Sequence, residues 1–178
     1  MSRRWAGVAL LLWIASLAVA GRQEAPAAPV YRPPPPPAQP IAFSHKQHVA
    51  TQSIECLECH ATATRDDRAT LPATSTCLDC HRTLGVDTPE IRKIWAADAS
   101  KEPVPWVRVY RLPDYVYFSH KVHASATPSI TCDQCHGSVR EMDLTQKVKD
   151  ISMAACIDCH KQRSAPITCG NTCHDTRG

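Results

Sequence analysis

Five cysteine-containing motifs constrain this chain more than any other feature. The pattern Cys-x-x-Cys-His occurs at 56–60, 77–81, 132–136 and 156–160, and a variant with one additional residue, CGNTCH, occupies 169–174. All ten cysteines of the 178 residues lie in these motifs, and a histidine directly follows the second cysteine of each. The fold must therefore be arranged around whatever these thiols and imidazoles bind.

The motifs belong to an internal repeat. The segment FSHKQH at 43–48 precedes the first two motifs, and FSHKVH at 118–123 precedes the next two. Corresponding positions of the two copies are 75, 76 and 79 residues apart, so both order and spacing are kept. A histidine pair followed by two motifs is thus used twice, and the variant motif is added to the second copy.

Disulfides, zinc and covalent haem are three ways to use these cysteines. An even cysteine count fits disulfides, but disulfides do not explain the histidine after every pair. The 17 residues of 60–76 and the 20 residues of 136–155 separate successive pairs as in a zinc ribbon, yet a ribbon needs neither the adjacent nor the upstream histidines. Cys-x-x-Cys-His is the attachment signature of haem c, so the sequence favours haem.

The haem interpretation gives every motif residue a role. The two thiols bond the haem, and the histidine after them becomes the proximal ligand of the iron. Five haems c are expected, four at exact motifs and the fifth at the variant. The predicted attachment residues are Cys56, Cys59, Cys77, Cys80, Cys132, Cys135, Cys156, Cys159, Cys169 and Cys173, and the predicted proximal ligands are His60, His81, His136, His160 and His174.

The histidine pairs supply the predicted distal ligands. His45 with His48, and His120 with His123, are the four histidines outside the motifs. At a spacing of three on one helical turn, two side chains lie on the same face of the helix. They cannot hold one iron from opposite sides, so each is expected to serve a different haem. Phe43 and Phe118, two residues before the pairs, pack either on a porphyrin face or in an ordinary core.

One axial position is left over by this assignment. Five six-coordinate irons need ten axial ligands, and the chain has nine histidines. Met153 and Met142 are the two methionines of the region after residue 40, and Met153 is the predicted tenth ligand. Core filling by methionine and an open coordination site are the alternatives. An open site would permit small-molecule chemistry, so this position separates an electron carrier from an enzyme.

The sequence divides into three predicted parts. Residues 1–20 read as a signal peptide or a membrane anchor, because two arginines precede the sixteen uncharged residues 5–20 and an Ala-x-Ala site ends them. Residues 21–40 are predicted to be a proline-rich linker, with eight of the fifteen prolines between 26 and 40. Residues 41–178 are the predicted multihaem domain. Export places this domain in the periplasm, and retention of residues 1–20 as an anchor would tether it to the inner membrane.

The predicted fold is mainly α with much irregular structure, in two dihaem repeats plus a C-terminal haem. Only ten aromatic residues are present, so porphyrins are expected to form much of the core. Each motif is expected on a short helix. Further helices are predicted from Pro89, capped by Thr88, and over about 144–160, with an extended segment over 104–118.

The chain resembles known multihaem proteins at specific residues. The FSHKxH pairs and multiple motifs are similar to class III cytochromes c, in which such histidines are distal ligands of different haems. VPWVRVYRLPDYVYFSHKVH at 104–123, CDQCHGSVREMDL at 132–144 and ISMAACIDCH at 151–160 resemble the pentahaem subunit of alternative complex III, a bacterial quinol:electron-acceptor oxidoreductase. This resemblance implies electron relay beside iron–sulfur and quinol-oxidising membrane subunits. Cys169 and Cys173 depart from the usual spacing.

Three function classes follow. The leading prediction is an electron-transfer subunit with no catalytic site of its own, and a soluble periplasmic shuttle is the alternative within that class. A multihaem reductase would need one open haem site, and a zinc-binding structural module would carry no haem. A formal charge of +3 without a basic patch argues against nucleic-acid binding, and ionised haem propionates would make the protein acidic.

Overall fold

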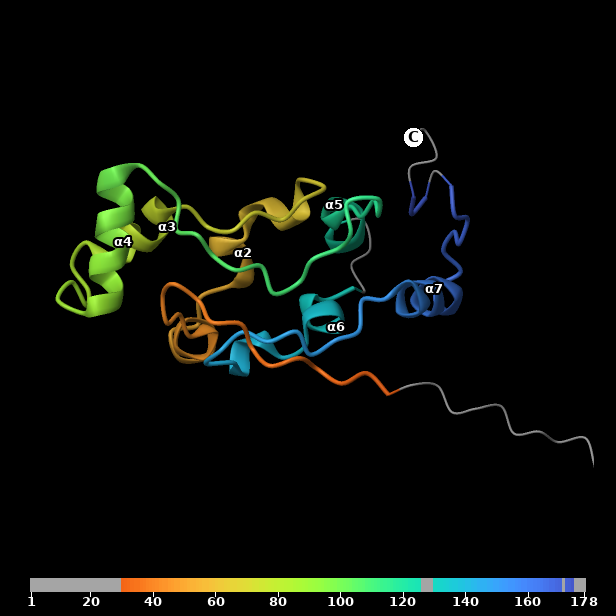
Figure 1. The fold of residues 1–178 in the computed structure, drawn as a ribbon, viewed down its shortest axis with the longest axis horizontal. Coiled ribbons are helices and arrows are strands. Elements are labelled where there is room, and N and C mark those ends of the chain that lie inside the picture. The colour runs from red at the N-terminus through yellow and green to blue at the C-terminus, as the bar shows by residue number, and fades with distance from the viewer. Residues whose placement is uncertain (1–29, 126–129, 171, 175–178) are drawn as a thin grey trace, which may run out of the picture. The chain divides into compact units, whose positions relative to one another are not determined.

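The computed structural model describes residues 30–125, 130–170 and 172–174 (Figure 1). Residues 31–178 form one compact unit. The elements in chain order are η1 (Lys46–Thr51), α2 (Cys56–Cys59), η2 (Ala61–Thr64), α3 (Thr74–His81), α4 (Pro89–Ser100), α5 (His120–Ala124), α6 (Cys132–His136), η3 (Val139–Glu141) and α7 (Met153–Gln162). The described residues contain isolated β-bridges but no strand, so the predicted fold class, mainly helical with much irregular structure, is confirmed.

The protein core is small and lies at α3 and α4, which pack side by side (Figure 1). Among the described residues, four apolar side chains are buried: Ile41, Leu78, Ile91 and Ile94. The partly buried Trp95 and Trp106 pack against them. Such a core is small for a unit of this length, as the low aromatic content predicts.

Helix α4 confirms the prediction made from its end signals. The Thr88 hydroxyl accepts a hydrogen bond from the Ile91 amide at 3.4 Å, and Pro89 occupies the first helical position. The helix ends at Lys101, whose φ of 59° is left-handed and stops the α-helical ladder. The apolar face predicted at Ile91 and Ile94 is the buried one.

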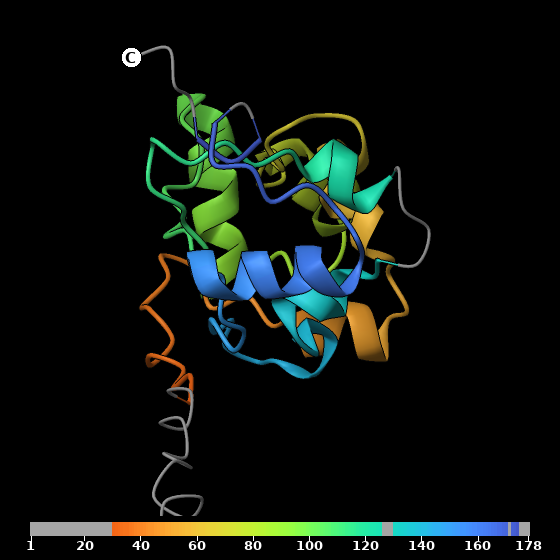
Figure 2. The same cartoon turned by 90° about the vertical axis from the view of Figure 1, so that its right-hand side faces the viewer.

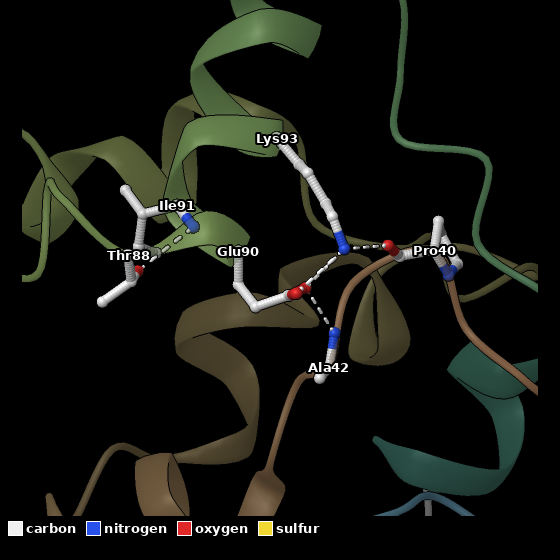
Figure 3. A network of polar contacts seen from close by, with 6 residues as sticks. All are labelled: Pro40, Ala42, Thr88, Glu90, Ile91 and Lys93. Atoms are coloured by element: carbon white, nitrogen blue, oxygen red, sulfur yellow. Dashed lines mark hydrogen bonds and ion pairs between the residues drawn. The ribbon is translucent and has the colours of Figure 1, made fainter.

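A polar network ties the start of α4 to the segment before the first histidine pair (Figure 3). The Glu90 carboxylate accepts hydrogen bonds from the Ala42 amide at 2.8 Å and from the Lys93 ammonium at 2.9 Å. Lys93 also donates to the Pro40 carbonyl at 3.1 Å. The network therefore fixes the chain three residues before His45, at Ala42.

The Glu90→Gln substitution should reduce stability in a pH-dependent way. Hydrogen bonds from Lys93 and from the Ala42 amide lower the Glu90 pKa below its ordinary value of 4.5. A lowered folded-state pKa contributes stability that is present above the unfolded pKa and is lost as pH falls through the folded one. Urea midpoints of the variant and the parent should therefore differ at pH 6, and the difference should shrink as pH falls below 4.5. Glu102→Gln, an exposed control, should show no such trend; a pH-independent difference would contradict the prediction.

The helix predicted over 144–160 is wrong in its first half. Helix α7 begins at Met153, where the Ser152 hydroxyl accepts from the Ala155 amide at 3.3 Å and donates to the Asp150 carboxylate at 2.8 Å. Before it, the amides of Val148 and Lys149 donate to the Tyr110 hydroxyl at 3.1 and 3.2 Å. Amides used in this tertiary contact cannot build the intrahelical ladder, so 144–152 stays irregular.

The segment over 104–118 is irregular and extended, as predicted, with one bridge between Val116 and His174. Figure 2 shows the C-terminal segment after α7 passing this segment, and the Tyr117 amide donates to the Cys173 carbonyl at 2.8 Å.

The four exact motifs lie on α2, α3, α6 and α7, as predicted. The variant motif does not: its described residues form turns and bridges, so that part of the prediction is wrong.

Besides the contact of Pro40 with Lys93, the proline-rich stretch contacts the rest of the unit at three points. Gln39 exchanges two hydrogen bonds with the main chain of Val107, at 2.8 and 3.0 Å. The Tyr31 hydroxyl donates to the Lys147 carbonyl, and Gln146 donates to the Pro34 carbonyl.

The predicted segment 1–20 and the first nine residues of the predicted linker lie outside the described residues. The division at residues 20 and 40 stays a prediction. No described helix is long and apolar enough to cross a membrane.

Candidate haem sites

The two histidine pairs have nearly identical surroundings. In the first copy, Phe43 meets the His45 ring edge-on at 4.9 Å and stacks on the His48 ring at 4.4 Å. Phe118 meets His120 and His123 in the second copy at the same two distances and angles. Each phenylalanine separates two imidazoles that differ in direction. This arrangement suits two ligands that serve different irons.

Three distal histidines each face one proximal histidine. The ring centres are 6.1 Å apart for His48 and His81, 6.5 Å for His120 and His136, and 6.0 Å for His123 and His160. Two imidazoles bound to opposite sides of one metal ion, each through a bond of about 2 Å, have ring centres about 6 Å apart. The spacing of all three pairs therefore fits one iron between two imidazoles.

His45 and His60 are the expected fourth pair. Burial, followed by the neighbouring imidazoles of His60 and His48, lowers the pKa of His45 to about 4. In the repeat, His45 corresponds to His120 and His60 to His136, which face one another in the second copy. The distal histidines thus pair in chain order with the four exact motifs.

Hydrogen bonds at the Nδ1 atoms leave the Nε2 atoms available for iron. Six imidazoles place Nδ1 within 2.6–3.3 Å of a main-chain carbonyl oxygen. A carbonyl only accepts, so Nδ1 carries the proton in these rings and Nε2 has its lone pair free. The six are His48, His60, His81, His123, His160 and His174. At His45, the partner of Nδ1 is the Thr145 hydroxyl at 3.0 Å.

Burial keeps three of the central imidazoles in the neutral form that binds metal. It lowers the pKa values of His45, His120 and His136, and neighbouring imidazoles add to the effect at His45 and His136. Paired neutral imidazoles supply the two axial positions of a haem iron, whose other four ligands belong to the porphyrin. In the described parts of the chain, no group of three or more His, Cys, Asp or Glu side chains gathers to hold a bare metal ion. The donor set fits haem.

Neighbouring thiols reveal the order of the attachment sites. Burial raises the pKa of the Cys56 thiol, and the adjacent Cys132 thiol raises it further. Burial likewise raises the pKa of Cys156, with Cys173 and then Cys135 as further causes. The Cys59 thiol, raised mainly by burial, also has Cys80 as a neighbour. The sites therefore follow one another as 77–80, 56–59, 132–135, 156–159 and 169–173.

The fifth site differs from the others at its distal side. His174 donates from Nδ1 to the Tyr115 carbonyl at 3.2 Å, and the Tyr115 ring stacks on it with ring centres 6.1 Å apart. A phenol oxygen extends beyond its ring, so a tyrosine bound to the same iron would need a larger separation. All four predicted distal histidines are assigned to the other motifs. Tyr115 therefore does not complete this site, which remains the one without a paired imidazole among the described residues.

Tyr110 is a site residue that the sequence did not reveal. Its ring meets the His136 ring edge-on at 4.7 Å, and its hydroxyl donates to the His136 carbonyl at 3.4 Å. The same hydroxyl accepts from the amides of Val148 and Lys149. Tyr110 thus positions the proximal histidine of the third motif from a segment predicted only to be extended.

The chain is similar in sequence to known cytochromes. The model of the class III cytochrome c family matches residues 21–104, which include the first histidine pair and the first two motifs. The chain is also 39% identical over 99 residues to the multihaem cytochrome c subunit of menaquinone reductase from Nitratidesulfovibrio vulgaris. That match covers 55% of this chain and 45% of the relative, so the chain spans less than half of the relative's length.

Residues 21–104 are similar to class III cytochromes c, and the two matches together support a multihaem cytochrome c of that type. They likewise support an electron-transfer role, and the lack of a catalytic site stays a prediction. Class III cytochromes c bind haem covalently, so the match supports the haem interpretation of the motifs over zinc and disulfides. The number of haems and the ligand assigned to each iron stay predictions.

Proposed function

We propose that the chain carries five haems c and passes electrons along them as the cytochrome subunit of a membrane quinol-oxidising complex. Haem supplies reversible one-electron chemistry. The residues of the chain do the rest. Eight histidines hold four irons in pairs, His174 holds the fifth, and Phe43 and Phe118 keep paired ligands apart.

The pairing of imidazoles is the observation that carries this proposal. Three exact motifs have a distal histidine at a spacing that fits a shared iron, and His60 of the remaining one is a neighbour of His45. With this assignment, both axial positions would be filled at four sites. An iron with two protein ligands exchanges electrons without binding a substrate. Relay is therefore favoured over reduction of a small molecule.

Membership of a complex rests on the relative. The Nitratidesulfovibrio vulgaris protein is named as a subunit of menaquinone reductase. That name supports a link to a quinone, whereas the direction, quinol oxidation, rests on the resemblance of residues 104–123 to the pentahaem subunit of alternative complex III. We place this chain in the periplasm, beside iron–sulfur and quinol-oxidising membrane subunits. Tethering through residues 5–20 belongs to the same proposal. The alternative within the class is a soluble periplasmic shuttle.

Intact mass of the full chain, matured in a host that attaches haem c, tests the proposal. Five haems together with residues 1–20 would support a tethered relay subunit. A product that begins at Gly21 and is monodisperse in solution would favour the shuttle. A high-spin absorbance band from a five-coordinate haem would favour the reductase, and a mass without haem would overturn the proposal.

Met153 is proposed as the distal ligand of the fifth site. It lies at the start of α7, is 68% exposed, and precedes Cys156 by one helical turn. Cys156 is the thiol beside Cys173. Met142, by contrast, lies at the end of η3 and its carbonyl accepts from the Lys46 amide at 3.0 Å, next to the first histidine pair.

Met153→Ala should therefore convert one haem to the high-spin form, and Met142→Ala should not. A thioether opposite histidine raises the potential of its haem, so the parent should also show one haem titrating above the others. Absorbance and a potentiometric titration of both holo-proteins measure these effects. Identical spectra for the two variants would exclude Met153 as a ligand.

A further inference from the structure

The loop after the first motif holds the histidine pair of the other repeat. The main-chain amides of His120 and Lys121 donate to the carbonyls of Asp67 and Asp66, at 2.9 and 3.1 Å. The Ser119 hydroxyl donates to the Asp67 carboxylate. Ser119 is the one buried polar residue of the described chain, with 4% of its surface exposed. Asp67 thus contacts the segment 118–123 across more than fifty residues of sequence.

The loop after the third motif does the same for the first histidine pair. The Lys46 amide donates to the Met142 carbonyl at 3.0 Å, and the Ser44 hydroxyl donates to the Asp143 carboxylate at 2.7 Å. Asp67 and Asp143 each lie seven residues after the histidine of the first motif in their own repeat. The contacts are therefore reciprocal: each repeat holds the distal ligands of the other.

Each aspartate fixes a serine that caps a distal segment. The Ser119 hydroxyl accepts from the Val122 amide at 3.2 Å, and the Ser44 hydroxyl accepts from the Gln47 amide at 3.0 Å. A hydroxyl that donates to a carboxylate has its lone pairs free to accept from such an amide. The aspartate thereby sets the orientation of the turn that carries both histidines of the pair.

We propose that Asp67 and Asp143 are matched positioning residues, each clamping the distal histidine segment of the opposite repeat, so that the two dihaem repeats are interlocked. This rests on the proposed haem assignment. The clamps lie where the first and third motifs meet: Thr70 accepts from His60, the Ala69 amide contacts His120 at 3.4 Å, and the Cys56 and Cys132 thiols are neighbours. That junction is the middle of the order of attachment sites.

The two clamps differ in strength. Asp67 also accepts from the Tyr117 hydroxyl at 3.2 Å, and its serine is buried. Asp143 is exposed, as Asp67 is, but its other partner is Lys46 at 4.0 Å, a weak ion pair. Loss of Asp67 should therefore perturb its distal pair more than loss of Asp143 perturbs the other.

Alanine and asparagine variants of Asp67 and Asp143 test the clamp in the full-length holo-protein. The oxidised EPR spectrum reports ligand orientation, and a potentiometric titration reports potentials. His120→Met and His45→Met first assign the signals of the third-motif and first-motif haems, because His/Met ligation raises the potential of the altered haem. Asp87→Asn, an exposed aspartate outside both clamps, is the matched charge control.

Asp67→Ala should broaden the EPR signal of the third-motif haem and add a high-spin fraction. Asparagine keeps an acceptor for Ser119 and should restore the signal. Both variants should show a positive shift of that haem's potential, since a nearby carboxylate is lost. Asp143→Ala should change the EPR signal and potential of the first-motif haem, but more weakly. Asp87→Asn should change neither haem.

The clamp would be overturned if the EPR and potential changes were confined to the haem of the aspartate's own repeat. It would also be overturned if the variant spectra equalled those of the parent. The five-haem proposal would stand in both cases. If Asp67→Ala fails to mature fully, masses of proteolytic haem peptides identify the empty motif. Loss of haem from the motif at 132–136 would support the clamp. Loss of haem from the motif at 56–60 alone would overturn it. A parent protein without haem would instead overturn the proposed function.

Discussion

Replacing His120 by methionine should raise the midpoint potential of a single haem, the one attached at Cys132 and Cys135. His120 faces His136 with ring centres 6.5 Å apart, and Phe118 separates it from His123. Axial ligands tune haem potentials over about 0.8 V, so exchange of one imidazole for a thioether is expected to shift this haem by on the order of 0.1 V. For a one-electron couple, that is roughly a fiftyfold change in the equilibrium constant.

A potentiometric titration measures the shift, and NMR identifies the haem. Haem-methyl signals with nuclear Overhauser contacts to Tyr110 belong to the third motif, because the Tyr110 ring lies 4.7 Å from the His136 ring. His45→Met is the matched variant in the other repeat and should move the first-motif haem instead. Two haems moving together in His120→Met, or movement of the fourth-motif haem, would show that the pairing is wrong.

The candidate haem-binding residues could be predicted because they lie at short, fixed spacings along the sequence. His120 and His123 lie three apart, so each was expected to serve a different iron, and they contact the rings of His136 and His160 separately. Ligation of the irons themselves stays a prediction. The boundaries of α4 were predictable for the same reason. Thr88 and Pro89 are adjacent to the helix they start, and no distant contact is needed to make them a cap.

Features that depend on distant contacts could not be predicted. Leu144, Val148 and Ile151 share a helical face, but Tyr110, nearly forty residues earlier, takes the amides of Val148 and Lys149. The clamps at Asp67 and Asp143 cross from one repeat to the other, which no local pattern reveals. Their one signal was an aspartate seven residues after the first motif histidine in both copies.

Gly137→Ala should destabilise the protein more than any other small substitution near the sites. Gly137 is buried directly after His136, with φ at 71° and ψ at −171°, a region open essentially to glycine alone. Forcing alanine into it costs about 1–3 kcal/mol. A Cβ would also lie well under 3.0 Å from Val148 Cγ2, and overpacking of this kind costs about 1–3 kcal/mol more.

Val148 cannot move aside without disturbing the third haem site. Its amide donates to the Tyr110 hydroxyl, and Tyr110 contacts both the ring and the carbonyl of His136. The clash should therefore appear in the haem as well as in stability. We expect incomplete attachment at 132–136 and, in the fraction that matures, a shifted spectrum of that haem.

Gly85→Ala separates the clash from the backbone cost. Gly85 also has a positive φ, 65°, but an added Cβ would meet its neighbours at 3.8 to 4.0 Å, which is ordinary contact. Its cost is confined to the left-handed conformation, about 1–2 kcal/mol. With roughly 2–4 °C of Tm lost per kcal/mol, thermal unfolding should place Gly137→Ala clearly below Gly85→Ala. If both variants lost the same amount of Tm, Val148 would have moved aside without cost. Tyr110 would then not fix His136 in the way that its contacts imply.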